Sequence, residues 1–173
     1  MEYIHGPYVT LKDFVKAPAD DEAMVMIRQY FQHMCAGLET LHNAKILHLD
    51  VKPSNYLFNK ETRIGKIVDL GTAQLQHTPR GSTSIDKPMP KIGTEGFRAP
   101  EQLRGIVQNG QDCLTPAADM WSVGIQMRAF LIGKMPFRSQ NQREGRSNYT
   151  IQLKQACAIS VTSSSHRDGG NAK

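Results

Sequence analysis

The sequence has few cysteines and no long apolar run, and each absence excludes a class of protein. Its three cysteines, Cys35, Cys113 and Cys157, are far apart and odd in number, so neither a disulfide framework nor a Cys-x-x-Cys metal pair is visible. No apolar stretch is long enough to span a bilayer, and the first residues lack the basic and apolar regions of a signal peptide. We therefore expect reduced thiols in a soluble, intracellular protein without a membrane partner.

Basic residues and histidines are also not clustered. The formal net charge is +5 and the pI about 9.2, but Lys and Arg are scattered, and scattered basic residues usually form a solvated face. A nucleic-acid-binding function would rest on net charge alone. The six histidines show no spacing typical of a metal site. With 173 residues, of which 39% are hydrophobic, the chain is long enough for one domain with a sizeable core.

Two segments have the apolar patterns of helices. Between Asp20 and Asn43, apolar residues recur every three or four positions, and Asp20 or Asp21 can cap the start. A second helix is expected to begin at Thr115-Pro116 and to end at Gly133, and its interior is apolar on nearly every face, which predicts burial on all sides. The apolar stripe of the first helix, which we expect in the core, consists of Met24, Ile27, Phe31, Met34, Leu38 and Leu41.

A β-hairpin is predicted between these helices, and the remaining segments are irregular. Residues 56–58 and 66–68 are short strand-like runs joined by a polar connector. Residues 72–98 are rich in Gly, Pro, Ser and Thr, which predicts a long loop, and loops of this length are usually either functional or disordered. After residue 137 the pattern weakens, with at most a short helix over residues 151–159 and a disordered tail over residues 161–173.

The segment from His48 to Asn55, between the first helix and the hairpin, carries a set of side chains suited to phosphoryl transfer. Asp50 can accept a hydroxyl proton, and Lys52 can neutralise phosphate oxygens. Asn55 and Asp69, at the two ends of the predicted hairpin, offer the hard oxygen atoms that Mg²⁺ prefers. Two such ligands and one base suit a reaction that depends on positioning and charge neutralisation.

Three short motifs occur in an order that resembles the protein kinase family. They read His48-Leu49-Asp50, Asp69-Leu70-Gly71 and Ala99-Pro100-Glu101, in place of H-R-D, D-F-G and A-P-E. The sequence of residues 50–55 and 93–101 is most similar to that of the cell-division-cycle Ser/Thr kinases that trigger replication origins with an activator subunit. Departures from this pattern include Leu49, which replaces an arginine and cannot pair with a phosphate, and the loop over residues 72–98, which is shorter than in those kinases.

The resemblance implies a fold that is mainly α with a small β-hairpin, namely the C-terminal large lobe of a kinase without the N-terminal lobe and the last helices. Residues 1–137 would form this partial kinase domain, and residues 138–173 a poorly patterned tail. The chain would begin at the hinge between the lobes, although an untethered N-terminus is an equal alternative. The hinge and Leu57 would hold adenine, with Met1 as gatekeeper and with the backbone of Glu2 and Ile4 as hydrogen-bonding groups.

The resemblance also implies roles for the remaining site residues. Asp50, Lys52 and Thr94 would be catalytic, and Thr94 would hydrogen-bond the other two side chains. Asn55 and Asp69 would bind the metal. Structural roles would fall to His48, packed inside the lobe, to Asp119, which would hold the backbone of the catalytic loop, and to Leu70 and Glu101.

The predicted function is transfer of the γ-phosphoryl group of ATP, with Mg²⁺, to a Ser or Thr hydroxyl of a protein substrate. No Gly-rich phosphate loop, V-A-I-K lysine or partner Glu occurs in the sequence, so we expect a fragment that is inactive alone. An activator subunit or a separate small lobe would then be a partner. The alternative is a non-catalytic kinase-lobe interaction module or pseudokinase fragment. The resemblance implies a nuclear location, with a cytoplasmic one as the alternative.

Overall fold

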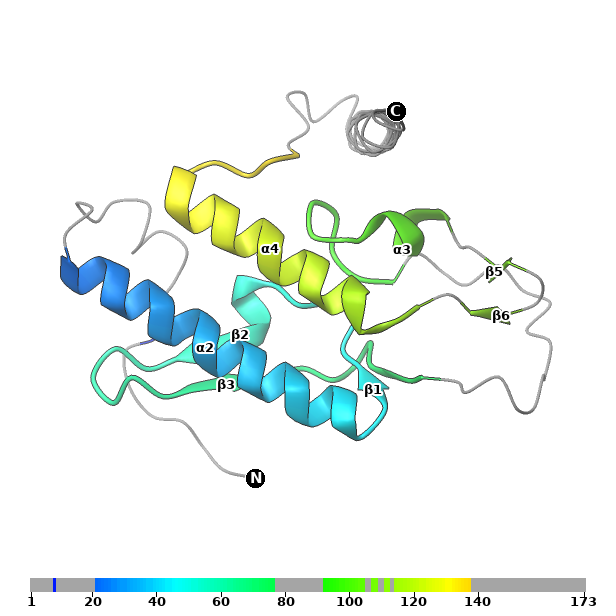
Figure 1. Ribbon diagram of the computed structural model, residues 1–173, viewed down its shortest axis with the longest axis horizontal. Helices are drawn as coiled ribbons and strands as arrows, with labels where there is room; N and C mark the ends of the chain where they lie inside the picture. Colours follow the sequence, from blue (N-terminus) through cyan, green and yellow to red (C-terminus); the bar gives the residue numbers. More distant parts are fainter. Residues whose placement is uncertain are drawn as a thin grey trace, which may run out of the picture. The chain divides into compact units, whose positions relative to one another are not determined.

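The computed structural model describes Tyr8 and residues 21–76, 92–104, 107–108, 111–112 and 114–137. The chain divides into two compact units, Met1–Pro136 and Phe137–Lys173, and the first is described below. Its largest elements are two helices, α2 and α4, and a hairpin of strands β2 and β3 (Figure 1). The elements with their bounds are α2 (Asp21–Asn43), β1 (Ile46–Leu47), the 3-10 turn η1 (Pro53–Asn55), β2 (Tyr56–Phe58), β3 (Gly65–Ile67), β4 (Gln74–Leu75), α3 (Pro100–Arg104), β5 (Val107–Gln108), β6 (Gln111–Asp112) and α4 (Pro116–Ile132).

Helix α2 forms where the apolar periodicity predicts it, and one face of its middle is buried. Phe31, Met34 and Leu38 are in the core, together with Tyr30, which the predicted stripe did not include. Ile27 and Leu41 are partly buried and pack against this core. Met24 is 45% exposed, so its predicted place in the core is wrong. Its position in the first turn lies beyond the core, which forms around the middle of the helix.

Helix α4 has the ends that the sequence predicts. The Thr115 side chain accepts a hydrogen bond from the Ala117 N–H at 3.3 Å, and Pro116 occupies the first turn, where a missing N–H costs nothing. At the other end Gly133 has a φ of 71° and donates its N–H to the Ala129 carbonyl at 2.8 Å. A left-handed residue at this point is a common helix stop, and glycine adopts it without strain.

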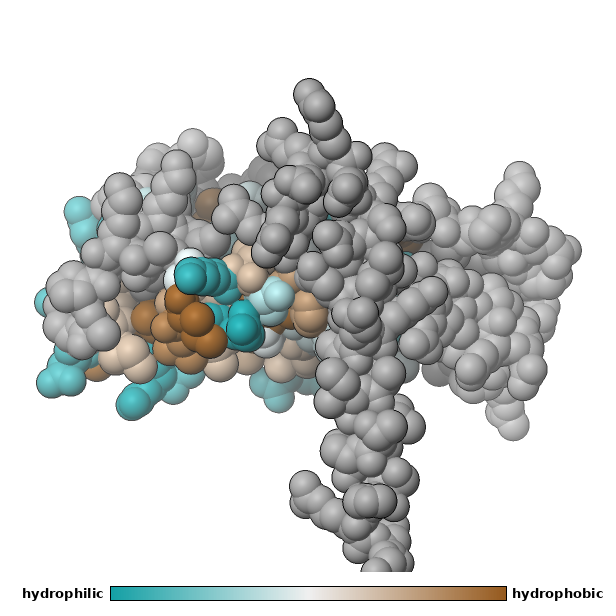
Figure 2. All heavy atoms as spheres, turned by 90° about the horizontal axis from the view of Figure 1, so that it is seen from above, coloured by the Kyte–Doolittle hydropathy of each residue, from teal (hydrophilic) through white to brown (hydrophobic). Residues whose placement is uncertain are grey.

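The prediction that α4 is buried on all sides is wrong. Val123 and Phe130 face the core next to α2, and Ala118 faces a second apolar cluster. A remaining face of α4 is open, and its large apolar side chains are between 40% and 57% exposed. Figure 2 views the protein from the side on which α4 lies in Figure 1, and apolar atoms gather there beside hydrophilic ones. This exposed α4 stripe consists of Met120, Met127, Leu131 and Ile132.

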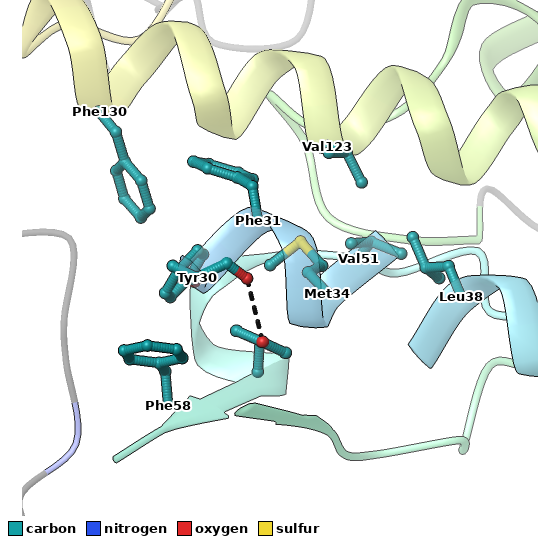
Figure 3. Packing of buried hydrophobic residues seen from close by; sticks show 9 residues of the cluster. Tyr30, Phe31, Met34, Leu38, Val51, Phe58, Val123 and Phe130 are labelled. Carbon is teal, nitrogen blue, oxygen red and sulfur yellow. Dashed lines mark hydrogen bonds between the residues drawn. The ribbon is translucent and has the colours of Figure 1, made fainter. Parts of the chain in front are cut away.

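The main core joins α2, α4 and the hairpin around Tyr30 (Figure 3). The Tyr30 ring meets the rings of Phe31, Tyr56 and Phe130 edge-on, with centroids 4.7–5.1 Å apart, which is a favoured arrangement of aromatic pairs. The Tyr56 hydroxyl donates to the Tyr30 carbonyl at 3.0 Å. The cluster consists of Tyr30, Phe31, Met34, Leu38, Val51, Tyr56, Phe58, Val123 and Phe130.

Three two-stranded antiparallel sheets complete the described structure. In the hairpin, Tyr56 pairs with Ile67 and Phe58 with Gly65, so β3 begins one residue earlier than predicted. The phenol of Tyr56 lies over Gly65, where any Cβ would collide with it. Strand β1 pairs with β4, and β5 with β6. The sequence did not predict these pairs, because two-residue strands are too short to carry an alternation. Among the described residues, Cys35 is a free thiol and no helix is long and apolar enough to cross a membrane.

Neighbouring residues near the end of α4 allow a direct test of this packing. We predict that Phe130→Ala lowers the free energy of unfolding by about 3–5 kcal/mol, because it removes a buried ring and leaves a cavity. Leu131→Ala, on the exposed α4 stripe, should change it by less than about 0.5 kcal/mol. Denaturant unfolding followed by circular dichroism measures both values. Equal effects of the two substitutions would contradict the assignment of the open face.

Candidate active site

The loop over residues 48–55 is fixed by the carboxylate of Asp119, which α4 contributes. One Asp119 oxygen accepts the His48 N–H at 2.9 Å, and the other accepts the Leu49 N–H at 2.7 Å. The Nε2 atom of His42, near the end of α2, lies 2.8 Å from the first oxygen. Asp119 is 1% exposed, and a buried carboxylate is costly unless several donors surround it. The carboxylate therefore joins both long helices to the loop.

Apolar side chains of the loop enter two different clusters. Val51 belongs to the main core. Leu49 is buried in the second cluster, with Leu47, Ala99 and Ala118, and the partly buried Trp121 packs against this cluster. Leu49 itself has a φ of 64°, a left-handed conformation that L residues seldom adopt. The loop is thus held by burial on both sides.

Asp50, Lys52 and Thr94 form a closed triangle of polar contacts. The Lys52 Nζ atom lies 2.8 Å from Asp50 Oδ2 and donates to the Thr94 hydroxyl at 2.7 Å. The Thr94 hydroxyl donates in turn to Asp50 Oδ1 at 2.7 Å. Thr94 comes from the segment over residues 92–104, so the triangle ties that segment to the loop. The structure therefore brings together the three residues that the sequence singled out as catalytic.

The contacts of the triangle set the charge state of Asp50. Burial raises the pKa of the Asp50 carboxyl, but the hydrogen bonds from Lys52 and Thr94 and the charge of Lys52 act in the opposite direction. Their sum is larger, and the pKa of Asp50 lies below its ordinary value. The side chain is a carboxylate at neutral pH.

Asn55 directly precedes β2 and Asp69 follows β3, so the two residues lie at the same end of the hairpin. The Val68 N–H donates to the Asn55 carbonyl at 3.0 Å, so Asp69 follows directly after the residue that pairs with Asn55. The Asn55 amide nitrogen donates to the Asp50 carbonyl at 3.0 Å and to Asp50 Oδ2 at 3.2 Å, which leaves Oδ1 of Asn55 as an acceptor. Asp69 is exposed, has a φ of 64°, and accepts the Gly71 N–H at 3.2 Å.

The donor chemistry of this pair fits Mg²⁺. An amide oxygen and a carboxylate are hard ligands, and Mg²⁺ is usually bound by one or two protein groups together with water and phosphate oxygens. Among the described residues, no group of three or more His, Cys, Asp and Glu side chains could hold a metal ion. A metal here would thus depend on the oxygen atoms of Asn55 and Asp69 and on those of a bound phosphate.

The residues expected to have structural roles differ in their surroundings. The His48 ring is fully buried, its Nε2 lies 3.2 Å from the Val68 carbonyl, and its Nδ1 accepts the Asp50 N–H at 3.3 Å. Glu101 is in the first turn of α3, and no ion pair of its carboxylate occurs within the described part of the chain. Leu70 is 52% exposed and belongs to neither apolar cluster, so the described residues give it no packing role. Leu70 follows Asp69, whose backbone is left-handed, and β3 has already ended at Ile67.

The residues expected to hold adenine are only partly described. Met1, Glu2 and Ile4 lie outside the described residues. Leu57 is partly buried on β2, where it pairs with Lys66. A single β-bridge joins Tyr8 to Asn59, so the chain shortly after the expected hinge lies next to the end of β2.

Sequence reasoning missed several residues that support the loop. Gln102 donates to the Leu49 carbonyl at 2.9 Å and accepts the Ala99 N–H at 2.8 Å. Its place, as the third residue of α3, is a signal that could have been used, because Gln there caps a helix start. Ser122 of α4 donates to the Phe97 carbonyl at 2.8 Å. His42 had no such signal, since its partner Asp119 is 77 residues away.

Comparisons with known proteins give matches over most of the chain. The model of the protein kinase domain family matches residues 1–169. Zebrafish (Danio rerio) striated muscle preferentially expressed protein kinase is 37% identical over 123 residues, which cover 71% of this chain and 4% of the relative. Probable cell division control protein 7 homolog 2 of Encephalitozoon cuniculi is 32% identical over 142 residues, 64% of this chain and 39% of the relative. The Schizosaccharomyces pombe serine/threonine-protein kinase ssp1 is 31% identical over 117 residues, which cover 68% of this chain and 18% of the relative.

These relatives are much longer than the chain, which matches between 4% and 39% of their lengths. The helices and small antiparallel sheets described above fit part of a kinase fold. Because the family model covers nearly the whole sequence, the chain belongs to the protein kinase domain family.

Proposed function

We propose that the chain carries the catalytic loop of a Ser/Thr protein kinase, which together with a Gly-rich kinase lobe transfers the γ-phosphoryl group of ATP to a protein hydroxyl. The observation that carries this proposal is the closed triangle of Asp50, Lys52 and Thr94. It joins an ionised carboxylate, a cation and a hydroxyl within hydrogen-bonding distance, next to an amide oxygen suited to a metal. This arrangement suits in-line phosphoryl transfer, in which positioning and charge neutralisation supply most of the rate.

Asp50 is the residue that orients the substrate hydroxyl and accepts its proton. Oδ2 of Asp50 accepts hydrogen bonds from Lys52 and Asn55, and Oδ1 accepts that of the Thr94 hydroxyl. The backbone of Thr94 also contacts the carboxylate and contributes to its low pKa. The carboxylate is therefore ionised at neutral pH and can accept the proton of an incoming hydroxyl.

Lys52 holds Asp50 and supplies positive charge where the phosphoryl group would pass. Its side chain is partly exposed, so the ammonium can meet solvent and substrate as well as Asp50. Asn55 and Asp69 would hold Mg²⁺, which neutralises the negative charge of the ATP phosphates when it is bound. By resemblance, Met1, Glu2, Ile4 and Leu57 would hold adenine.

The finer assignments follow from the resemblance and from the names of the relatives. The chain would be the large lobe of a nuclear Ser/Thr kinase with a protein substrate and an activator subunit. Support comes from the contact of Thr94 with Asp50 and Lys52 and from the Encephalitozoon cuniculi relatives, whose names place them with cell division control protein 7. A non-catalytic interaction module is the alternative, and the exposed α4 stripe is the observation that favours it.

Radiolabel transfer from ATP to a generic Ser/Thr substrate tests the proposal. Because the sequence contains no Gly-rich phosphate loop, the 173-residue chain is assayed alone and with a Gly-rich kinase lobe supplied in trans or by fusion. We predict little transfer by the chain alone, Mg²⁺-dependent transfer with the added lobe, and a loss of about a hundredfold or more in Asp50→Asn. Asp21→Asn, at an exposed position, is the control. Transfer that is absent, or equal in Asp50→Asn, would favour the interaction module.

The triangle also predicts how the pKa of Asp50 changes when each of its two partners is removed. Removing Lys52 (Lys52→Met) should raise the pKa of Asp50 more than removing the Thr94 hydroxyl (Thr94→Val), because the Lys52 contact is the larger of the two that lower it. Thr40→Val, which removes an exposed hydroxyl on α2, should leave it unchanged. A ¹³C NMR titration of the carboxyl measures these values, and an unchanged pKa in both triangle variants would contradict the described contacts.

The same shift has a consequence for stability. Since the folded-state pKa of Asp50 is lowered, its contribution to stability is present above the ordinary carboxyl value of about 3.9 and is lost as the pH falls through the folded value. The difference in unfolding free energy between the protein and Thr94→Val should therefore shrink at low pH.

Burial of Leu49 in an apolar cluster predicts activity without phosphorylation of the loop over residues 72–98. An arginine at this position could pair with a phosphate, but a buried leucine cannot. Replacing Ser82, Thr83 and Ser84 together by Ala should keep kcat/KM within about twofold in the preparation with an added lobe. Phosphatase treatment should have equally little effect. A large gain on phosphorylation that depends on the residue at position 49 would contradict this prediction.

A further inference from the structure

Gln102 joins the start of α3 to the backbone of the catalytic loop. It is 8% exposed, and both ends of its amide are used: Oε1 accepts the Ala99 N–H at 2.8 Å, and Nε2 donates to the Leu49 carbonyl at 2.9 Å. The contact with Ala99 is one that either Gln or Glu can make as the third residue of a helix. The contact with Leu49 needs a donor, which an ionised Glu lacks.

The carbonyl that Gln102 holds belongs to the peptide group that leads into Asp50. The Leu49 C=O and the Asp50 N–H are parts of one planar unit. Gln102 binds the oxygen of this unit, and Nδ1 of His48 accepts its N–H at 3.3 Å. Two contacts on opposite ends of a rigid plane fix its rotation. They therefore fix the direction in which the Asp50 side chain leaves the backbone.

This peptide group needs such support because Leu49 is strained. Its φ of 64° is unfavourable for an L residue and persists only where the surroundings enforce it. The Leu49 N–H is bound by Asp119 at 2.7 Å, and the side chain is buried in the second cluster. Gly93 lies against the carbonyl: a Cβ there would come within 2.5 Å of the Leu49 oxygen, and its φ is 87°. Within the described residues, Gln102 supplies the hydrogen bond to this oxygen.

We propose that Gln102 is a positioning residue that sets the orientation of Asp50 for phosphoryl transfer through a neutral hydrogen bond to the Leu49 carbonyl. This rests on the function proposed above for Asp50. The hydrogen bond from Gln102 to the Leu49 carbonyl joins two neutral groups. The side chain of Leu49 packs against neutral residues of the second cluster. This hydrogen bond therefore joins the segment over residues 92–104 to the catalytic loop without a phosphorylated residue.

Two substitutions separate the two contacts of Gln102. Gln102→Glu keeps an acceptor for the Ala99 N–H and removes the donor to Leu49, whereas Gln102→Met has a similar length and removes both. Gln32→Glu and Gln32→Met, at an exposed position of α2, are matched controls. Amide hydrogen exchange in the full 173-residue chain is measured by NMR, and guanidinium unfolding checks that each variant folds.

The exchange pattern distinguishes positioning from capping. We expect the Asp50 amide to exchange about tenfold faster in both Gln102 variants, and the Ala99 amide to exchange faster only in Gln102→Met. The Gln32 variants should match the unsubstituted protein at both amides. An unchanged Asp50 amide in Gln102→Glu overturns the proposal, since the bond to Leu49 would then have no effect on the loop.

Kinetics in the preparation with an added lobe provide the second readout. Both Gln102 variants should lower kcat by about tenfold to a hundredfold and leave the KM for ATP within about twofold, because a misplaced Asp50 affects the transition state more than nucleotide binding. An unchanged kcat overturns the proposal. If the unsubstituted protein transfers no phosphate, the proposed function fails, and the Asp50 amide alone then decides whether Gln102 sets the backbone.

Discussion

The structure depends first on a buried negative charge that is satisfied by backbone groups. Asp119 is 1% exposed, and an ionised carboxylate in such a place is stable only with several good donors. Two of these donors are the N–H groups of His48 and Leu49, and the third contact is the His42 ring. Moving α4 or the loop would break the two backbone contacts, and moving α2 would remove the contact of His42. The shape of the loop over residues 48–55 is thus linked to the docking of α2 and α4.

The loop also illustrates how apolar packing can direct polar side chains. Leu47 and Leu49 enter one cluster, and Val51 enters the other. The residues between them therefore lie where the two clusters meet, and Asp50 extends from there toward Lys52 and Thr94. Gln102 adds the hydrogen bond that holds the intervening peptide group. Burial fixes the position of the loop, and hydrogen bonds fix its orientation.

Local sequence patterns predicted the regular elements well and their surroundings less well. The periodicity of α2, the Thr115 and Gly133 ends of α4 and the hairpin are local features, and all three are found in the structure. Exposure of Met24 was missed, because burial depends on which elements pack nearby rather than on residue type. For the same reason, the apolar sequence of α4 did not indicate which of its faces is packed and which is exposed.

In the candidate site, too, local motifs identified some residues, and residues that act through distant partners were missed. The motifs identified Asp50, Lys52, Thr94, Asn55 and Asp69, and the structure supplies the distances among the first three and the pairing beside the other two. Gln102 and His42 were not identified, since each acts through a partner far away in the sequence. Roles that rest on Met1, Glu2 and Ile4 stay predictions, because these residues lie outside the described structure.

The contacts of Asp119 have a consequence for how this chain folds. Its bonds to His48 and Leu49 join residues 71 and 70 positions apart, and those of Gln102 and Thr94 to the loop span 53 and 44 positions. Contacts between such distant residues require a large loss of chain entropy before they contribute, and they form slowly. In a chain made from its N-terminus, residues 48–50 emerge long before α4 exists. The helix α2 and the hairpin precede α4 in the sequence, whereas the loop over residues 48–55 can complete its backbone contacts only when Asp119 of α4 is present.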